Sequence, residues 1–454
     1  MEIHELTAGE LMARLGDGAL SSVEIVEALE RRRTQIDRSI NAFVLVREQA
    51  LAEAREADEA RRRGELRGPL HGLPITIKDN IDVAGTDSTL GLQARRGKPA
   101  ERDALLVSEL RRKGAIVLGK TNVPQLLLAQ ETENALFGVT HNPWNLERVP
   151  GGSSGGEAAA IASGMSALGI GTDIGGSIRI PAHFCGVVGF KPTLDRWSNR
   201  GSQTGIPGQE IVRSQIGCLA RSVDDAALLW RALDPRDQSR QDPLVPPLEA
   251  GDPVDVRGLT VGWFDDDEFL MPVTSLRRAV TRARDALEAA GARVVTHRSV
   301  PSDEVIFLWL GALAADGGRT IDERLSGETI SPQLKPSRTL LRLPPAARKA
   351  AGALAERLGE RRVGRLLKTL GERRVDQLWA LTYARTALRL REFDAWRESG
   401  IDAVICPAHV VPALRHRESG DFVMSVGAEF RWTLLNFPAG IVPVTRVRAE
   451  EVGH

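Results

Sequence analysis

The sequence predicts an α/β fold, in which helices cover both faces of a large mixed β-sheet. Short β-rich runs alternate with helical patterns along the chain, and two of these alternations have the order strand, helix, strand. The chain has 454 residues, 42% of them hydrophobic, so it can bury the large core that a covered sheet requires. Neither observation requires more than one domain.

The first sixty or so residues are expected to begin as helices that lie against the rest of the fold. Thr7 with Glu10, and Ser21 with Glu24, each match the S/T-x-x-E capping box. In this motif each side chain accepts a hydrogen bond from the backbone N–H of the other residue, which satisfies free donors at the start of a helix. Two helices are therefore predicted to begin at these motifs.

The first strand–helix–strand unit lies between residues 74 and 118. Pro74–Lys78 is a short β-rich run, residues 103–113 have a helical pattern, and Gly114 ends that helix. Residues 115–118 are predicted to be the next strand. Units of this kind place their two strands in parallel within one sheet.

A second unit of the same order follows in the C-terminal half. Its predicted elements are a strand at 259–264, an amphipathic helix at 274–290 and a strand at 292–296, and a further strand is predicted at 402–406. Residues 234–258 are rich in Pro, Asp and Arg, which is typical of a surface connection between two halves.

Composition and charge argue against several classes of protein. Lys plus Arg and Asp plus Glu both number 60, so no net charge attracts nucleic acid. Cys185, Cys218 and Cys406 lie too far apart for a disulfide framework or a zinc site, which favours a reducing compartment. The N-terminus lacks the features of a signal peptide, and the longest uncharged run, 158–172, is shorter than the roughly 20 residues that cross a bilayer. A cytoplasmic protein with no nucleic-acid partner is therefore expected.

The stretch from Gly151 to Arg179 carries the main functional signal. It consists of GGSSGGEAAAIASGMSALGIGTDIGGSIR, in which Ser153 and Ser177 lie 24 positions apart, each on a sharp turn that glycine permits. Three other glycine-rich motifs do not fit this stretch. The first turn lacks the lysine of a P-loop, and the later glycines are spaced too widely for a dinucleotide fingerprint. The string G-G-S-I-R lacks the second glycine of a nucleophile elbow. The eight histidines show no zinc spacing, so no metal and no cofactor are expected.

A serine hydrolase without a catalytic histidine fits the remaining residues. Lys78 ends an apolar β-rich run, where burial can lower the pKa of a lysine and make it a base. Ser153 can relay a proton between this lysine and Ser177, because a hydroxyl donates and accepts at once. A Gly-Gly-Ser turn also leaves backbone N–H groups open to a developing oxyanion. The candidate donors are Ile174, Gly175, Gly176 and Ser177.

The string from GGSSGGEAAAIASG to GTDIGGSIRIPA, with PITIKDN upstream, resembles the amidase signature family residue for residue. The resemblance implies the amidase signature fold and a Ser-Ser-Lys hydrolase. It assigns Ser177 as the acyl-enzyme nucleophile, Ser153 as the bridging serine on a cis peptide, and Lys78 as the base. It gives Asp173 and Arg179 a structural role in fixing the nucleophile loop.

Further strings resemble the fatty-acid amide hydrolase branch of this family, and together the similarity spans about residues 70–447. These strings are DSTLGL, LFGVTHNPWN, FCGVVGFKPT, GQEIVRSQIGCLAR and LLNFPAGIVPVTRV. The resemblance implies an amidase of the EC 3.5.1 type that cleaves a small-molecule amide, with a long or bulky acyl group, to an acid plus an amine or ammonia. It predicts one domain over 1–454, with a helical segment at about 1–65, the signature core at about 66–232 and a second α/β part with a helical cap at about 258–447.

Two other functions stay open at this point. The A-type chains of glutamine amidotransferases share the signature and pass ammonia to a partner chain. A truncated, inactive homologue is the other alternative, because family members continue past the equivalent of Thr445 through a further strand and helix. Residues 441–447 are apolar enough to need burial, so the final strand is expected to lack its covering element.

Residues 340–379 place leucines and alanines at helical spacing with many arginines between them. Such a basic amphipathic segment can lie in a membrane interface, and the resemblance implies a cap that touches the membrane near an acyl channel. An ordinary surface helix is the commoner case in soluble proteins, and Glu356, Glu360 and Glu372 interrupt the basic face. Peripheral membrane contact through this segment and a homodimer both stay open.

Overall fold

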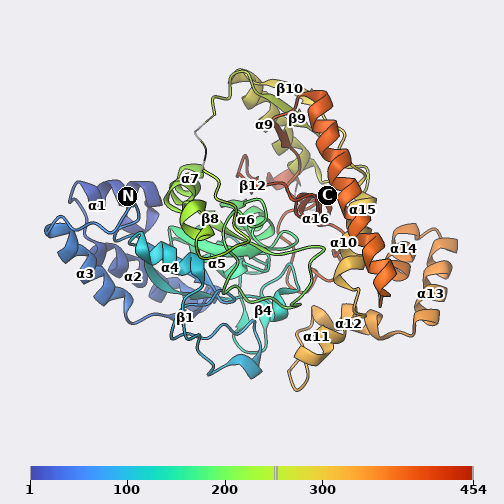
Figure 1. Cartoon of the computed structure of the whole chain (residues 1–454), viewed down its shortest axis with the longest axis horizontal. Helices are drawn as coiled ribbons and strands as arrows, with labels where there is room; N and C mark the ends of the chain where they lie inside the picture. The colour runs from blue at the N-terminus through green and yellow to red at the C-terminus, as the bar shows by residue number, and fades with distance from the viewer. Residues whose placement is uncertain (1, 250, 252–253, 452–454) are drawn as a thin grey trace.

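A seven-stranded mixed sheet lies at the centre of the molecule (Figure 1), with the strand order β1-β3-β2-β6-β8-β7-β12. The structure is a computed structural model that describes residues 2–249, 251 and 254–451. The strands are β1 (Phe43–Val46), β2 (Pro74–Lys78), β3 (Ile116–Thr121), β6 (Leu168–Asp173), β7 (Val188–Lys191), β8 (Gln215–Ala220) and β12 (Ala439–Ile441). Strands β3, β2 and β6 are parallel neighbours, whereas β1, β8, β7 and β12 pair antiparallel, which confirms the predicted mixed sheet.

Helices cover both faces of this sheet, as predicted (Figure 1). The helices α1 (Ala8–Gly16), α2 (Ser22–Ile40), α3 (Ala50–Arg62), α4 (Leu105–Arg112) and α7 (Val223–Ala232) share a hydrophobic cluster with Ile75 and Ile77 of β2. Successive side chains of a strand point to opposite faces, so Thr76 and Lys78 face the other side. On that side lie α5 (Gly155–Ala162) and α6 (Arg179–Cys185), which pack on Leu219 of β8.

The predicted N-terminal helix starts and the first strand–helix–strand unit are confirmed. Thr7 and Ser21 each accept a hydrogen bond from the backbone N–H of the glutamate three residues later, at 3.2 Å in both cases, and both capping boxes are complete. Strands β2 and β3 are parallel neighbours connected through α4. Shorter elements are the 3₁₀ helices Ile3–Glu5, Gln93–Arg95, Gln125–Leu127 and Ala449–Glu451 and the hairpin of β4 (Glu133–Asn134) with β5 (Gly138–Val139).

The second predicted unit forms a sheet of its own instead of extending the central one. Strands β9 (Thr260–Trp263), β10 (Arg293–Thr296) and β11 (Ala403–Ile405) are all parallel in the order β10-β9-β11, with α9 (Thr274–Ala289) as the crossover. The strands lie where the sequence predicted them, but local patterns carry no information on which sheet a strand joins. The preceding connection, 234–258, contains α8 (Pro235–Ser239), and its residues 250, 252 and 253 lie outside the described residues.

In the described part of the C-terminal half, seven further helices follow. They are α10 (Ser302–Leu313), α11 (Arg319–Arg324), α12 (Leu334–Arg342), α13 (Pro345–Arg357), α14 (Arg361–Thr369), α15 (Val375–Ser399) and α16 (Gly427–Leu434). The predicted cap, 340–379, is the hairpin of α13 and α14 with the helix ends on either side, at the right of Figure 1. Among the described helices, none combines the length and the apolar character needed to pass through a bilayer.

The last strand, β12, lies at an edge of the central sheet and pairs only with β7 in the described part of the chain. The segment that follows it contains exposed valines. Val442, Val444 and Val447 keep 55%, 44% and 42% of their surface in solvent. This edge is therefore an apolar surface next to the central sheet.

Candidate active site

Lys78 lies at the end of β2 with its side chain fully buried. Its Nζ donates a hydrogen bond to the Oγ of Ser153 at 2.7 Å. It also donates to Oγ1 and the carbonyl O of Thr172, at 3.0 and 3.3 Å. Lys78 and Thr172 belong to the neighbouring parallel strands β2 and β6, so the sheet itself brings the lysine to the turn that carries Ser153.

Burial lowers the pKa of Lys78 to about 7, although the negative charges of Asp173, Glu157 and Asp79 act in the opposite direction. A lysine with this pKa is uncharged in about half of the molecules at neutral pH. Its nitrogen can then accept a proton from a hydroxyl at hydrogen-bonding distance. The structure therefore gives Lys78 the electrostatic setting that the sequence analysis expected of a base.

Ser153 lies on a turn where glycine is required at two positions. Gly151 has a φ of +87°, and a Cβ there would lie 2.7 Å from the Cα of Pro181. A Cβ on Gly152 would lie 2.4 Å from the carbonyl O of Ala129. The peptide bond between Gly152 and Ser153 is cis, as the resemblance implied.

The loop that carries Ser177 is fixed by an ion pair between Asp173 and Arg179, both buried. The guanidinium donates through Nε and Nη2 to the two carboxylate oxygens, each at 2.9 Å. The carboxylate also accepts from the backbone N–H of Gly176 at 2.8 Å and of Ile178 at 3.2 Å. Burial alone would raise the pKa of Asp173, but Arg179 and these donors lower it to about 2. A permanently charged pair therefore holds the residues on both sides of Ser177.

The two serines lie on adjacent loops that the backbone joins. The N–H of Ser154 donates to the carbonyl O of Ser177 at 3.0 Å. Within the described residues, no hydrogen bond connects the hydroxyl of Ser153 to that of Ser177. Catalytic hydrogen bonds are often long in ligand-free enzymes and shorten when a substrate binds. The structure thus forms the first link of the predicted relay, from Lys78 to Ser153, and leaves the second link open.

The structure separates the predicted oxyanion donors into two groups. The N–H of Gly176 donates to Asp173, so it is not free for an oxyanion as the sequence analysis expected. The cause is the short loop, which brings this amide back over the end of β6. The backbone N–H groups of Ile174, Gly175 and Ser177 have no hydrogen-bond acceptor in the part of the chain that the structure describes.

Sequence reasoning missed two buried partners of Lys78. Thr172 precedes Asp173 in the GTDIGGS string, and its contacts with the lysine depend on strand pairing that the string does not encode. Glu157 accepts hydrogen bonds from Thr76 at 2.6 Å and Thr121 at 2.8 Å, and burial raises its pKa to about 8. The sequence does give one indication of Glu157, because it is the single acidic residue in a run of small residues.

Two aromatic rings lie behind the nucleophile loop. Trp309 of α10 and Phe430 of α16 stack with 3.7 Å between their ring centroids. A Cβ on Gly175 would lie 2.7 Å from the Trp309 ring and 2.8 Å from the Phe430 ring, and the indole N–H donates to the carbonyl O of Ile174 at 3.2 Å. The C-terminal half thus contacts the loop directly, which local sequence patterns do not indicate.

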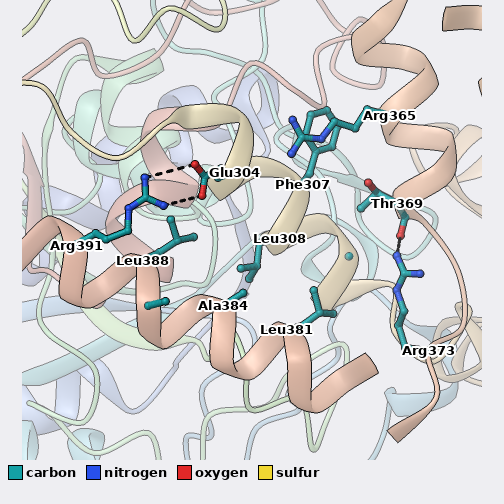
Figure 2. Close-up of a pocket in the computed structure, with 12 residues that line it drawn as sticks. Glu304, Phe307, Leu308, Arg365, Thr369, Arg373, Leu381, Ala384, Leu388 and Arg391 are labelled. Atoms are coloured by element: carbon teal, nitrogen blue, oxygen red, sulfur yellow. Dashed lines mark hydrogen bonds and ion pairs between the residues drawn. The ribbon is translucent and has the colours of Figure 1, made fainter. Parts of the chain in front are cut away.

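A groove of about 380 Å³ lies between α10, α14 and α15 (Figure 2). Its α10 side consists of residues at helical spacing, among them Phe307 and Leu308, and α15 contributes Leu381, Ala384 and Leu388. Arginines lie at its edges in Figure 2, and they are Arg365, Arg373 and Arg391. The groove and Trp309 belong to different faces of α10, so this one helix contacts both the groove and the nucleophile loop.

In the described ranges, no three His, Cys, Asp or Glu side chains come together in a way that could hold a metal ion. The groups at this site that can carry chemistry are Lys78, the two serines and the backbone amides. Together with the fold, this arrangement is typical of hydrolases that cleave amide bonds through a serine activated by lysine.

Comparison with known proteins agrees with this class. Residues 24–452 match the family model described as Amidase, so the chain belongs to the amidase family and is a hydrolase of linear amides, of the EC 3.5.1 type. Fatty-acid amide hydrolase 1 of Sus scrofa is 36% identical over 447 residues, which cover 97% of this chain and 75% of that protein.

A solved structure of a fatty acid amide hydrolase superposes with a TM-score of 0.84 at 27% identity, and the match covers 96% of this chain and 73% of the other. The A-type chain of the glutamyl-tRNA(Gln) amidotransferase of Carboxydothermus hydrogenoformans is 39% identical over a shorter region, 64% of this chain and 60% of that protein. The predicted family and fold are confirmed by these matches.

Proposed function

We propose that this chain hydrolyses a carboxylic amide with a long or bulky acyl group, through an acyl-enzyme on Ser177. The observation that carries the proposal is the 2.7 Å hydrogen bond from Lys78 Nζ to Ser153 Oγ inside a fully buried site. It places a lysine with a pKa of about 7 at the start of a hydroxyl relay.

The proposed reaction uses these groups in the order of the relay. Uncharged Lys78 takes the proton of the Ser153 hydroxyl, Ser153 takes the proton of Ser177, and the Ser177 oxygen forms a bond to the amide carbon. The carbonyl oxygen becomes an oxyanion, which the free N–H groups of Ile174, Gly175 and Ser177 can stabilise. The carbon–nitrogen bond then breaks while the relay returns a proton to the leaving nitrogen. Water next attacks the ester by the same route and releases the acid.

The test of the nucleophile is covalent labelling. A fluorophosphonate is expected to add one label to the wild-type chain and none to Ser177→Ala. Ser326→Ala, on the surface, is the matched control and should label like the wild type. Labelling that persists in Ser177→Ala would place the nucleophile elsewhere.

The relay predicts how kcat/KM changes with pH on the acid side of neutrality. Because Lys78 must be uncharged, kcat/KM should rise about tenfold per pH unit below pH 6 and level off above about 7. A Lys78→Met variant should lose about 100- to 10,000-fold in rate, together with this limb of the profile. An unchanged acid limb in Lys78→Met would show that another group is the base.

The groove in Figure 2 supports a long acyl group as the substrate's acid part. Its volume and apolar lining are in the range of small-molecule sites. Ala384 lines the groove, so Ala384→Phe should lower kcat/KM for long-chain amides about tenfold and leave short-chain amides within about twofold. Thr386→Phe, at an exposed position on the other side of α15, is the control. Equal losses for short and long amides would remove the groove from the proposal.

A free-standing enzyme is favoured over a component of an amidotransferase. The similarity to the fatty-acid amide hydrolase spans 97% of the chain, whereas that to the amidotransferase spans 64%. An assembled Lys78–Ser153 pair also supports an active enzyme over a decayed homologue. Glutaminase activity that appears only with a captured partner chain would reverse this choice.

The exposed side of the α13–α14 hairpin supports a peripheral contact with membranes. Leu354 and Leu358 keep 58% and 74% of their surface in solvent, next to the exposed Arg357, Arg361 and Arg362. A basic face with exposed leucines can bind an anionic lipid surface without crossing it. We place the protein in the cytoplasm, at times bound to a membrane surface through this hairpin.

A further inference from the structure

Glu429 of α16 has a buried carboxyl that the proposed reaction does not use. Its side chain is 1% exposed, and neither Oε1 nor Oε2 has a hydrogen-bond partner in the described part of the chain. Buried carboxylates are normally paired or hydrogen-bonded, because an isolated charge in the interior is costly. An unpartnered acid at this depth therefore points to a function.

This side chain lies directly against the nucleophile loop. A Cβ on Gly176, the residue before Ser177, would lie 2.8 Å from both the Cβ and the Cγ of Glu429. The backbone carbonyl of Glu429 accepts from Nη2 of Arg179 at 2.9 Å, and Arg179 in turn holds Asp173. The carboxyl thus sits behind the loop that offers amides to the oxyanion.

The charges that face this carboxyl come from several elements. Burial raises the pKa of Glu429 to about 8. Arg179 of α6 opposes the rise, whereas Asp173 at the end of β6 and Asp267 between β9 and α9 add to it. Cys406, after β11, also interacts electrostatically with Glu429, and no ion pair joins Glu429 to Arg179 among the described residues. The acid is therefore neutral at neutral pH and becomes charged in mild alkali.

We propose that Glu429 is a positioning residue that must stay a neutral acid for the nucleophile loop to work. Ionisation would put an unpaired negative charge behind Gly176, close to the site where the transition state develops its own negative charge. The loop would then stabilise the oxyanion less well or shift away from the new charge. The inference rests on the proposed amidase reaction and adds an alkaline limit to it.

The test is the alkaline limb of the kcat/KM profile. At pH 7.0 about half of the Lys78 side chains are still charged, and at pH 9.5 an ionisation with a pKa of about 8 is nearly complete. The wild-type value at pH 9.5 should therefore be about fifteenfold below the value at pH 7.0. Glu429→Gln keeps the shape and stays neutral, so its own ratio between these two pH values should change less than threefold. Glu398→Gln, at an exposed position of α15, should keep the wild-type ratio.

Two further measurements keep the inference open to refutation. Glu429→Met, which is neutral and of similar length, should also lack the fall of kcat/KM in alkaline solution. This variant replaces Glu429→Gln in the test if the glutamine variant does not fold. The role of Glu429 is overturned if a variant that circular dichroism shows to be folded still loses about fifteenfold in kcat/KM between pH 7.0 and 9.5. A wild type without this loss overturns it as well. If the wild type neither hydrolyses amides nor labels with a fluorophosphonate, the proposed function itself fails, and this inference fails with it.

Discussion

At the scale of single residues, the site buries several titratable groups and gives them different partners. Lys78 has only neutral donors and acceptors within hydrogen-bonding distance, so burial lowers its pKa to about 7, as the proposed base requires. Asp173 has the guanidinium of Arg179 and stays charged. Glu157 and Glu429 have no cation within ion-pair distance among the described residues, and burial raises the pKa of both to about 8. The difference between base, structural anion and neutral acid is therefore set by partners, not by residue type.

The Asp173–Arg179 pair gives a prediction on stability. Asp173→Asn leaves a buried guanidinium without its counter-charge and should lower the free energy of unfolding by about 3–5 kcal/mol, measured by urea denaturation. The folded-state pKa of Asp173 is depressed to about 2, so its contribution is fully present above the unfolded value of about 4 and is lost as the pH falls toward 2. Wild-type stability should fall in this window, and the variant should lack that part of the fall.

The control for this prediction is Asp255→Asn, on an exposed ion pair with Arg257. It should leave both the urea midpoint and its pH dependence unchanged. Equal stability of wild type and Asp173→Asn would show that the loop does not depend on this pair.

Three residues could be proposed for the site from the sequence because they lie in short strings with strict spacing, and the structure brings two of them, Lys78 and Ser153, into hydrogen-bonding distance. The local patterns are the apolar run PITIK, which ends at Lys78, and two Gly-Gly pairs, which are followed by Ser153 and Ser177. Thr172, Glu157 and Glu429 could not, because their roles arise only when strands pair and when α16 packs on the loop. The amide of Gly176 was predicted as a free donor, and only the folded loop shows that Asp173 takes it.

At the scale of elements, helix starts were predictable and sheet membership was not. The capping boxes at Thr7 and Ser21 are local, and both formed where the sequence placed them. The strands at 260–263, 293–296 and 403–405 were also located, but they pair with one another in a separate sheet. Pairing depends on contacts between residues far apart in sequence, which periodicity does not report.

The capping box of α2 predicts a modest loss of stability. Ser21→Ala removes the hydroxyl that accepts from the N–H of Glu24, and it should lower the free energy of unfolding by about 1 kcal/mol. Thermal unfolding followed by circular dichroism measures the change. Ser39→Ala, on the exposed side near the other end of α2, is the matched control and should differ from wild type by less than about 0.5 kcal/mol. Equal losses for the two variants would mean that the cap adds nothing to the helix.

At the scale of the whole molecule, the two α/β parts meet at the loop that carries Ser177. The central sheet supplies Lys78 and both serine turns, and α10 and α16 of the C-terminal half pack their aromatic rings behind the loop. The groove and the α13–α14 hairpin lie beyond α10, on the right of Figure 1. The one helix α10 thus contacts both the loop that carries Ser177 and the groove proposed for the acyl group.

This arrangement predicts that the hairpin controls binding to vesicles. The wild-type chain should co-sediment with vesicles that contain about a third anionic phospholipid, and binding should weaken in 0.5 M salt because exposed arginines supply part of the attraction. Leu358→Asp puts a charge on the most exposed leucine of the hairpin and should reduce the bound fraction severalfold. Leu248→Asp, at another exposed leucine far from the hairpin in sequence, should bind like the wild type. Activity on a water-soluble short-chain amide should be the same in the wild type and both variants. Loss of vesicle binding in both variants, or in neither, would contradict a membrane role for this hairpin.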